Sequence, residues 1–305
     1  MRFTWLLIAA SLVASGCQKP GDLAGRPAPD AQEAKVVTSK PATAPADQAV
    51  YKIVDGRELK LFLDKPPGWQ AGDSRPAMVF FHGGGWFGGE VKSFADQGKY
   101  LASRGMVCVH VEYRLIDRDN SEPPTICCQD AKSAMRWVRA HAKELGTDPN
   151  RIAAGGSSAG AHLASFASLV QGMDDPRDDL SVSPRADALI LLNPVFNNGP
   201  GEFGHNRVRD RYREFSPAHN IGPHAPPTVV FIGTADKLVA VRVVEQFQAD
   251  MAAAGVRCDA HYYEGRPHGF FFNQPWKTLT LIEADRFLAS LGWLSGEPTI
   301  SPPAQ

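Results

Sequence analysis

The segment Gly-Ser-Ser-Ala-Gly at residues 156–160 constrains this chain more than any other feature. An apolar run at 151–155 precedes it, and residues 161–166 after it have the composition of a helix. This is a G-x-S-x-G pattern between a strand and a helix, where the turn is so tight that a side chain at either glycine would strike its neighbours. The pattern predicts a serine nucleophile at Ser158. A small-residue turn without chemistry is the alternative, because Gly and Ser are common in turns.

Apolar runs on both sides of this turn predict a parallel sheet. The runs of buried-strand type lie at 77–81, 106–111, 188–192 and 228–232. A hairpin is predicted around Asp55-Gly56, a further strand at 259–263, and helices at 129–144 and 281–291. The alternation predicts a doubly wound, mostly parallel α/β sheet with helices on both faces, in a single domain at residues 48–294.

Two segments depart from this alternation. Residues 195–226 are rich in Gly, Asn, His, Arg and Pro, and they are predicted to form an insertion over the site. Residues 295–305 are predicted to be a disordered tail.

The N-terminus has the composition of an export signal. A positive charge precedes an apolar stretch at 3–13 that is too short to span a bilayer, so residues 1–16 are predicted to be a signal peptide. The segment that ends at Cys17 resembles the bacterial lipobox, which implies a diacylglycerol on this cysteine and a membrane anchor. Residues 17–47, rich in Pro and Ala, are then a disordered tether. Because Gln18 is not aspartate, an outer-membrane or periplasmic-face lipoprotein is expected, or a secreted protein if Cys17 is not lipidated.

Charge and cysteine spacing limit the partners of the chain. A net charge of −1 over 305 residues gives no general attraction to nucleic acid, so no nucleic-acid partner is expected. None of the cysteines beyond Cys17 has metal-site spacing, and no metal or cofactor is expected. Export permits a disulfide, but the sequence assigns no pairing, and packed free thiols are favoured. These cysteines are Cys108, Cys127, Cys128 and Cys258.

A serine nucleophile needs a base to take its proton and an acid to orient that base. His268, in the loop after the last predicted strand, is the expected base, and Asp236, directly after the strand at 228–232, is the expected acid. His162 is the rival base, but its place on the helix after Ser158 directs it away from the hydroxyl or into packing. His110 lies within a strand and is expected in the core. For Asp236, a turn-capping role is the alternative.

The oxyanion of an acyl-transfer reaction needs N–H donors. His82 and three glycines follow the strand that ends at residue 81, and their backbone N–H groups are predicted to face the site. Gly84, Gly85 and Ala159 are the candidate donors of this oxyanion hole, and which of the glycines at 83–85 contributes stays open.

Together these segments resemble the α/β-hydrolase superfamily, in its HGGG-bearing, hormone-sensitive-lipase-like branch, and most of all bacterial feruloyl- and acetylxylan-esterase-like proteins. The segments at 112–115, 148–152 and 267–270 also match. The resemblance implies the α/β-hydrolase fold, with Ser158 as nucleophile, Asp236 as acid and His268 as base. Lipase-like members often carry a helical N-terminal cap, and the tether in its place implies a more open site and argues against long-chain lipids.

The predicted function is an exported serine carboxylesterase that forms an acyl-enzyme. Its expected substrate, on the resemblance alone, is a small-molecule or polysaccharide ester. A serine peptidase of the prolyl-oligopeptidase type and a non-catalytic carbohydrate-binding protein of the same fold are the alternatives. The alternating arginines at 207–213 would favour acidic sugars if they face the site, with a solvated loop as the alternative. The acidic run at 174–179 is expected to be a surface turn rather than a calcium site.

Overall fold

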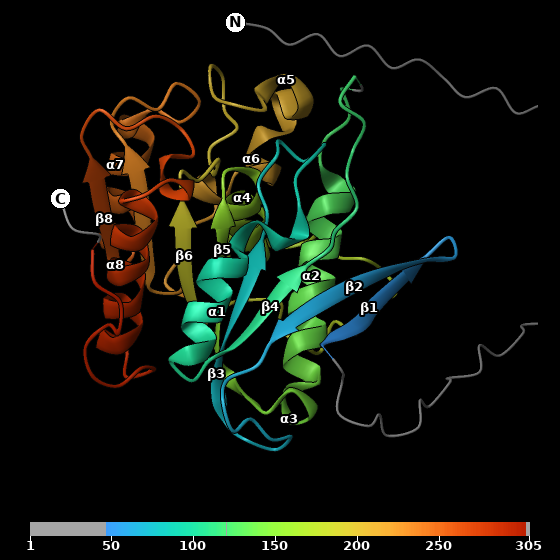
Figure 1. Cartoon of the computed structure of the whole chain (residues 1–305). Helices are drawn as coiled ribbons and strands as arrows, with labels where there is room; N and C mark the ends of the chain where they lie inside the picture. Colours follow the sequence, from blue (N-terminus) through green and yellow to red (C-terminus); the bar gives the residue numbers. More distant parts are fainter. Residues whose placement is uncertain (1–46, 120, 303–305) are drawn as a thin grey trace, which may run out of the picture. The chain divides into compact units, whose positions relative to one another are not determined.

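The structure, a computed structural model, describes residues 47–119 and 121–302. The predicted signal peptide, the lipidation site at Cys17 and the tether up to residue 46 lie outside the described residues. In the described part, eight strands form one sheet in the order β1-β2-β4-β3-β5-β6-β7-β8 (Figure 1). From β4 onward in this order the pairs are parallel, whereas β1–β2 and β2–β4 are antiparallel. The predicted doubly wound, mostly parallel sheet is therefore confirmed.

The strands are short and mostly buried. Their bounds are β1 Gln48–Val54, β2 Arg57–Asp64, β3 Arg75–Phe81, β4 Val107–Val111, β5 Thr147–Ser157, β6 Ala188–Leu192, β7 Thr228–Gly233 and β8 Cys258–Tyr263. The α-helices are α1 Ala95–Ser103, α2 Thr125–Ala140, α3 Ala142–Leu145, α4 Ala159–Leu169, α5 His205–Val208, α6 Tyr212–Phe215, α7 Val241–Ala253 and α8 Trp276–Ser290. Single 3-10 turns are η1 Val91–Phe94, η2 Arg209–Arg211, η3 Pro217–His219 and η4 Phe270–Phe272.

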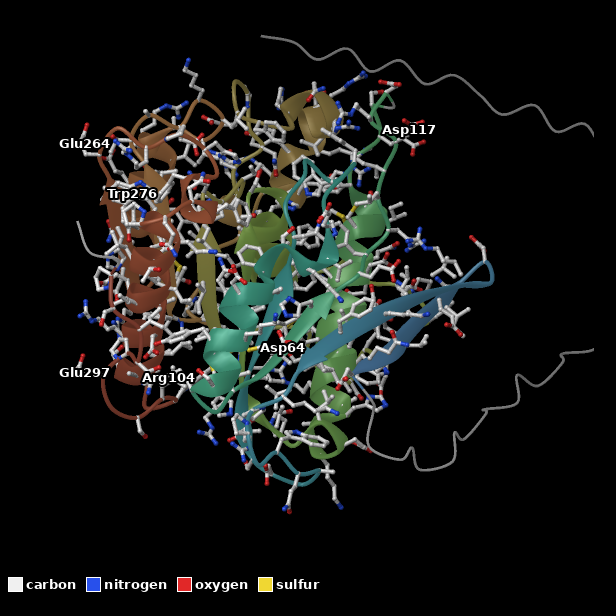
Figure 2. The ribbon with its side chains drawn as sticks, in the orientation of Figure 1. Asp64, Arg104, Asp117, Glu264, Trp276 and Glu297 are labelled. Carbon is white, nitrogen blue, oxygen red and sulfur yellow. The ribbon has the colours of Figure 1, made fainter. Side chains whose placement is uncertain are left out.

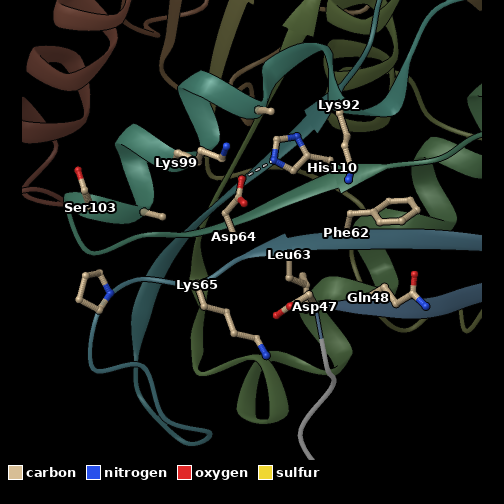
Figure 3. Close-up of a pocket in the computed structure, with 13 residues that line it drawn as sticks. Asp47, Gln48, Phe62, Leu63, Asp64, Lys65, Lys92, Lys99, Ser103 and His110 are labelled. Atoms are coloured by element: carbon tan, nitrogen blue, oxygen red, sulfur yellow. Dashed lines mark hydrogen bonds and ion pairs between the residues drawn. The ribbon is translucent and has the colours of Figure 1, made fainter.

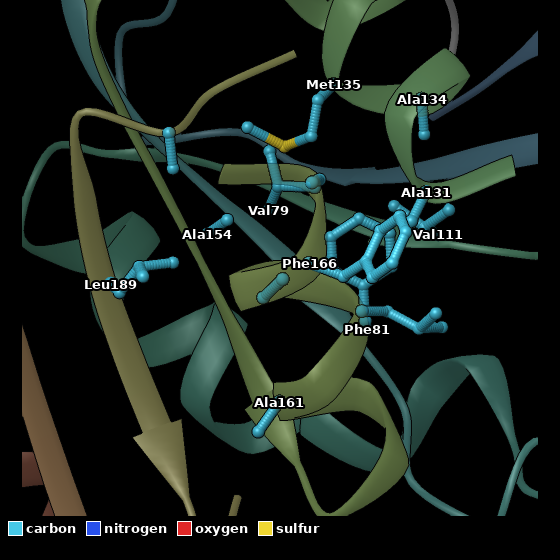
Figure 4. Packing of buried hydrophobic residues seen from close by; sticks show 14 of the residues in the cluster. Val79, Phe81, Val111, Ala131, Ala134, Met135, Ala154, Ala161, Phe166 and Leu189 are labelled. Carbon is cyan, nitrogen blue, oxygen red and sulfur yellow. The ribbon is translucent and has the colours of Figure 1, made fainter. Parts of the chain in front are cut away.

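Two hydrophobic layers result from the alternation of side chains along each strand. In β3, Val79 and Phe81 join a cluster with α2, α4 and α7, while Met78 and Phe80 join a second cluster with α1 and α8. Figure 4 shows the first layer, where Phe166 of α4 lies beside the strand side chains. A sheet covered on both faces presents its chemistry at the ends of its strands.

Three segments differ from the expectation. The helix predicted at 129–144 is divided into α2 and α3, because His141 leaves the helical conformation with φ −102° and ψ 23°. The insertion at 195–226 is built of short helical turns, α5, η2, α6 and η3. The prediction of a disordered tail at 295–305 is wrong for the first part of this segment, since Ile300 packs on the second hydrophobic layer.

The start of this tail is held by hydrogen bonds to α1. Arg104, labelled in Figure 2 near Glu297, donates 3.0 Å to the carbonyl of Gly296 and also pairs with Asp285 of α8 at 2.7 Å. The N–H of Thr299 donates 3.2 Å to the Tyr100 hydroxyl. These partners lie about 200 residues back in the chain, which is why local composition gave no sign of them.

The described cysteines are free thiols, as favoured from the sequence. Cys108, Cys127 and Cys128 are buried and Cys258 is half-buried. Burial raises the pKa of the Cys127 thiol to about 12. In the part of the chain that the structure describes, no helix combines the length and apolar character needed to cross a membrane.

Candidate active site

Ser158 occupies the turn between β5 and α4. Its φ of 53° and ψ of −119° are unusual for a residue with a side chain, so the turn is strained. The N–H of Ser158 donates 3.0 Å to the Leu192 carbonyl of β6, and its own carbonyl accepts from His162 at 3.0 Å. The structure thus has the strained elbow that the pattern predicted.

The two glycines of the pattern are required by the end of β3. A Cβ at Gly156 or at Gly160 would lie 2.0 Å from the carbonyl oxygen of Phe81, closer than atoms can approach. The strand that ends at Phe81 therefore passes directly against the elbow. This contact also brings the residues that follow Phe81 to Ser158.

The glycine run after Phe81 packs against the elbow. A Cβ at Gly83 would lie 3.5 Å from the Ser158 Cβ and 3.0 Å from the Ser157 carbonyl. Gly84 and Gly85 have φ of 118° and 64°, a region that favours glycine. The structure therefore brings the start of the glycine run, at Gly83, against Ser158, and the two candidate donors Gly84 and Gly85 directly follow it. Ala159, the first residue of α4, is fully buried there.

Asp236 and His268 meet through a hydrogen bond. The Nδ1 of His268 lies 2.7 Å from Oδ2 of Asp236, and the Asp236 side chain is fully buried while that of His268 is 23% exposed. An ionised carboxylate only accepts, so Nδ1 carries the proton and Nε2 is left as the basic nitrogen. The two predicted residues thus lie in hydrogen-bond contact, in the arrangement that an acid–base pair requires.

The loops that carry this pair are joined to each other. The N–H of Ala235 donates 3.1 Å to the carbonyl of Arg266, and the N–H of Gly265 donates 2.8 Å to Oγ1 of Thr234. A Cβ at Gly233 would lie 2.1 Å from the Arg266 carbonyl, so this close approach requires a glycine. The loops after β7 and β8 therefore hold the acid and the base as one unit.

The electrostatics of Asp236 favour its ionised form. Burial alone would raise the pKa of this carboxyl, but hydrogen bonds from His268 and from the backbone N–H groups of Val239 and Leu238 outweigh burial and lower the pKa below its usual value. These backbone donors bind Oδ1 at 3.0 and 2.8 Å. The turn-capping role weighed as an alternative is thus also present, on the other oxygen of the same group.

One neighbour of Asp236 was missed by the sequence analysis. Asn193 directly follows β6, and its side-chain amide donates to Oδ2 of Asp236. The signal was available, because the same rule that selected Asp236 and His268 applies to a polar residue directly after the strand at 188–192.

The rival base is engaged elsewhere. His162 is fully buried, accepts from the Trp86 indole N–H on Nδ1 at 3.2 Å, and bonds the Phe215 carbonyl through Nε2 at 2.8 Å. Burial lowers the pKa of His162 to about 4, so it is neutral at pH 7. The expectation that His162 points into packing is confirmed.

The arginines at 207–213 have different environments. Arg207 is buried, donates 2.9 Å to the Arg118 carbonyl, and lies 5.6 Å from the centre of the Phe87 ring. Arg211 pairs with Glu214 at 2.8 Å on the surface. Arg207 therefore holds the segment after β6 against the loop near residue 118 instead of lining a solvated loop.

The acidic run at 174–179 is not the simple surface turn that was expected. Asp175 is only 2% exposed and pairs with Lys52 and with Arg177, each at 2.8 Å. Hydrogen bonds from Arg177 and Lys52 hold the pKa of Asp175 well below its usual range, despite burial. Within the described residues, no group of three or more metal-binding side chains is arranged to hold a metal ion.

A pocket of about 800 Å³ lies apart from the predicted catalytic residues, beside β2, β4 and η1 (Figure 3). His110 and Asp64 lie there as a pair, with 2.8 Å between Nε2 and Oδ2. His110 is 3% exposed and stacks on Phe80, as expected of a core residue. A Cβ at Gly98 of α1 would lie 2.5 Å from the Asp64 carboxylate, so this glycine lets the helix cover the pair.

Comparisons with known proteins find esterases. The BD-FAE family model matches residues 65–191. The probable carboxylic ester hydrolase LipM of Mycobacterium tuberculosis is 30% identical over 217 residues, which are 63% of this chain and 48% of LipM. Esterase LipC of the same organism is 29% identical over 226 residues, 64% of this chain and 53% of LipC. The chain spans about half the length of these curated relatives.

Solved structures match over a longer stretch. The apo form of Thermogutta terrifontis esterase 2 has a TM-score of 0.78 and 41% sequence identity to this chain, and the match covers 84% of this chain and 98% of the other. The fold and the sequence thus agree over nearly the whole of that esterase. The chain belongs to the α/β-hydrolase superfamily of serine esterases.

Proposed function

We propose that this protein is a serine carboxylesterase in which Ser158 is the nucleophile, His268 the general base and Asp236 the orienting acid. The observation that carries the proposal is the 2.7 Å hydrogen bond between Nδ1 of His268 and Oδ2 of Asp236. It leaves Nε2 of His268 to accept the Ser158 proton. The strained elbow and the adjacent glycine run support the same assignment.

The proposed reaction has two halves. The Ser158 Oγ attacks the ester carbonyl while His268 takes its proton, and the oxyanion is bound by backbone N–H groups of Gly84, Gly85 and Ala159. The tetrahedral intermediate then expels the alcohol, which receives that proton from His268. Water, deprotonated by the same imidazole, attacks the acyl-enzyme and releases the carboxylic acid. No metal or cofactor enters these steps.

The proposed substrates are short-chain acyl esters, among them acylated carbohydrates. Structures of the Thermogutta terrifontis esterase are described as propionate-bound and butyrate-bound, which supports a short acyl group. The carbohydrate part rests on the sequence resemblance to feruloyl- and acetylxylan-esterase-like proteins. The curated relatives and the solved structures named above are esterases, which favours this function over the peptidase and the non-catalytic alternatives.

The proposed location is outside the cytoplasm. The apolar stretch at 3–13 and the lipobox-like segment before Cys17 support export and a lipid anchor, with the outer membrane as the destination. A short-chain esterase held there would meet small esters and polysaccharide fragments that enter from outside the cell.

The test is hydrolysis of p-nitrophenyl acetate by the wild type and by Ser158→Ala. We expect the variant to lose at least about 10⁴-fold in kcat with an unchanged far-UV spectrum, because it has no nucleophile. A related esterase is described as phosphorylated by paraoxon. Paraoxon should therefore add one phosphoryl adduct to the wild type, on the peptide that contains Ser158. In Ser158→Ala this peptide should carry no adduct. A variant that kept full activity would refute the assignment.

A further inference from the structure

The side chain of Asn193 lies against the carboxylate of the candidate acid. Its Nδ2 donates to Oδ2 of Asp236, the same oxygen that accepts the Nδ1 proton of His268. The backbone N–H of Asn193 donates 2.8 Å to the Phe231 carbonyl of β7, the strand that leads to Asp236. One carboxylate oxygen therefore receives two side-chain donors, each from a different strand end.

Asn193 is held in this position at a cost in stability. Its φ is 43°, a left-handed conformation that asparagine tolerates better than most residues with a side chain. Its side chain is fully buried, and Oδ1 has no hydrogen-bond partner among the described residues. Strained backbone and an unpaired buried acceptor are both unfavourable, and such features gather at functional sites. A side chain that only filled space would need neither of them.

The orientation of the amide follows from the carboxylate. Asp236 is ionised and only accepts, so the NH₂ group of Asn193 must face it, and the carbonyl is left turned away. With the Val239 and Leu238 N–H groups on Oδ1, the carboxylate is bonded on both oxygens and cannot rotate freely. Its Oδ2 is thereby held at hydrogen-bond distance from Nδ1 of His268.

We propose that Asn193 is a positioning residue of this site. Its amide fixes Asp236 toward His268 and offsets part of the negative charge on Oδ2 of Asp236. The inference rests on the proposed esterase function. The amide takes part of the charge on Oδ2, so that the carboxylate orients the imidazole without over-stabilising its protonated form.

Few other charges act on this ring. Asp236 is the charged side chain bonded to His268 among the described residues. On the two loops that hold the pair, Lys237 is exposed, Glu264 is exposed, and Arg266 lies 5.0 Å from the Trp276 ring. At the elbow and directly after β6, Ser158 and Asn193 have neutral side chains. A change at Asn193 should therefore be felt mainly through Asp236.

Two variants separate positioning from packing. Asn193→Gly tolerates the positive φ and removes the amide. Asn193→Asp keeps the size, and because two buried carboxyls in contact share one proton, the new carboxyl still donates to Asp236. We expect kcat on p-nitrophenyl acetate to fall roughly tenfold in Asn193→Gly and less in Asn193→Asp, with KM unchanged, because only the former loses a hydrogen bond to a charged group. The acid limb of the kcat/KM profile should move to higher pH in Asn193→Gly, since more negative charge on Asp236 favours protonated His268.

Asn198 offers a matched control. It is also buried, at 1% exposure, and also has an unpartnered Oδ1, but its amide donates 2.9 Å to the Phe203 carbonyl. Asn198→Gly should lower Tm without moving the acid limb. The inference is overturned if the acid limb stays in place in Asn193→Gly, or if Asn198→Gly moves it equally.

A second measurement does not depend on turnover. The proton between His268 and Asp236 should give a downfield NMR signal, and its pH titration should shift in Asn193→Gly but not in Asn198→Gly. An unshifted titration would contradict the role of Asn193 even if the wild type hydrolysed no ester. A shifted titration in a wild type without esterase activity would leave Asn193 as a positioning residue and refute the proposed function instead.

Discussion

The indole N–H of Trp86 donates a hydrogen bond of 3.2 Å to Nδ1 of His162. Trp86 ends the glycine run, His162 lies on α4, and its Nε2 bonds the carbonyl of Phe215 on α6. This one imidazole therefore joins the end of the glycine run, the helix after the elbow and the segment between β6 and β7. The network requires a neutral ring that accepts on Nδ1 and donates from Nε2.

This network predicts a loss of stability in mild acid. The pKa of His162 is about 4 in the folded protein and near 6.5 when unfolded, so below pH 6.5 the unfolded chain binds a proton that the folded chain binds only near pH 4. The free energy of unfolding should fall over this window, by about 3 kcal/mol in total. Urea unfolding from pH 7.5 to 4 measures it. In His162→Gln the free energy of unfolding should depend less on pH, while a substitution of exposed His224 should leave the pH dependence unchanged. The same pH dependence in the wild type and in His162→Gln would contradict the prediction.

The elbow glycines predict a large steric effect. Gly160→Ala would place a Cβ 2.0 Å from the Phe81 carbonyl oxygen, a backbone atom that cannot rotate away as the end of a flexible side chain could. We expect the free energy of unfolding to fall by about 3 kcal/mol or more. Gly222→Ala is the matched control, because a Cβ there meets nothing within 4 Å. Chemical denaturation of both variants decides the point, and equal stability would refute the close approach of β3.

Removing the charge of the candidate acid should slow catalysis without unfolding the protein. In Asp236→Asn the amide can no longer hold Nδ1–H of His268 in the right tautomer, and kcat should fall by about 10⁴-fold. Asp259→Asn, on β8 and paired with Arg257, is the control and should keep its activity. Steady-state kinetics on p-nitrophenyl acetate, with circular dichroism for folding, are the measurements. Comparable rates for both variants would rule out Asp236 as the acid.

The proposed anchor predicts where the protein is found in the cell. Full-length protein should incorporate radiolabelled palmitate and sediment with membranes, because a diacylglycerol on Cys17 holds it there. Cys17→Ser should abolish the label and release the protein, whereas Cys258→Ser should change neither. A wild-type protein that is soluble and unlabelled would argue for simple secretion.

The sequence by itself determined the fold and selected the main candidate site residues. Buried parallel strands appear as continuous apolar runs, and parallel strands place their carboxyl ends on one edge, so residues directly after these runs are candidates for one site. This is how Ser158, Asp236 and His268 were selected as candidates, and the glycine run likewise. Each of these signals lies within a few residues of the strand that positions it, which is why local patterns were sufficient.

Only the tertiary structure decided the contacts between distant segments. The amide of Asn193 reaches Asp236 across 43 positions, and Trp86 reaches His162 across 76. The same holds for the burial of Asp175 against Lys52 and for the docking of residues 296–300 on α1. Local periodicity shows which face of a helix or strand is buried, but it does not show which polar group of another segment pairs with a polar side chain on that face. Those pairings depend on how the elements pack, and they determine which way the acid and the base point.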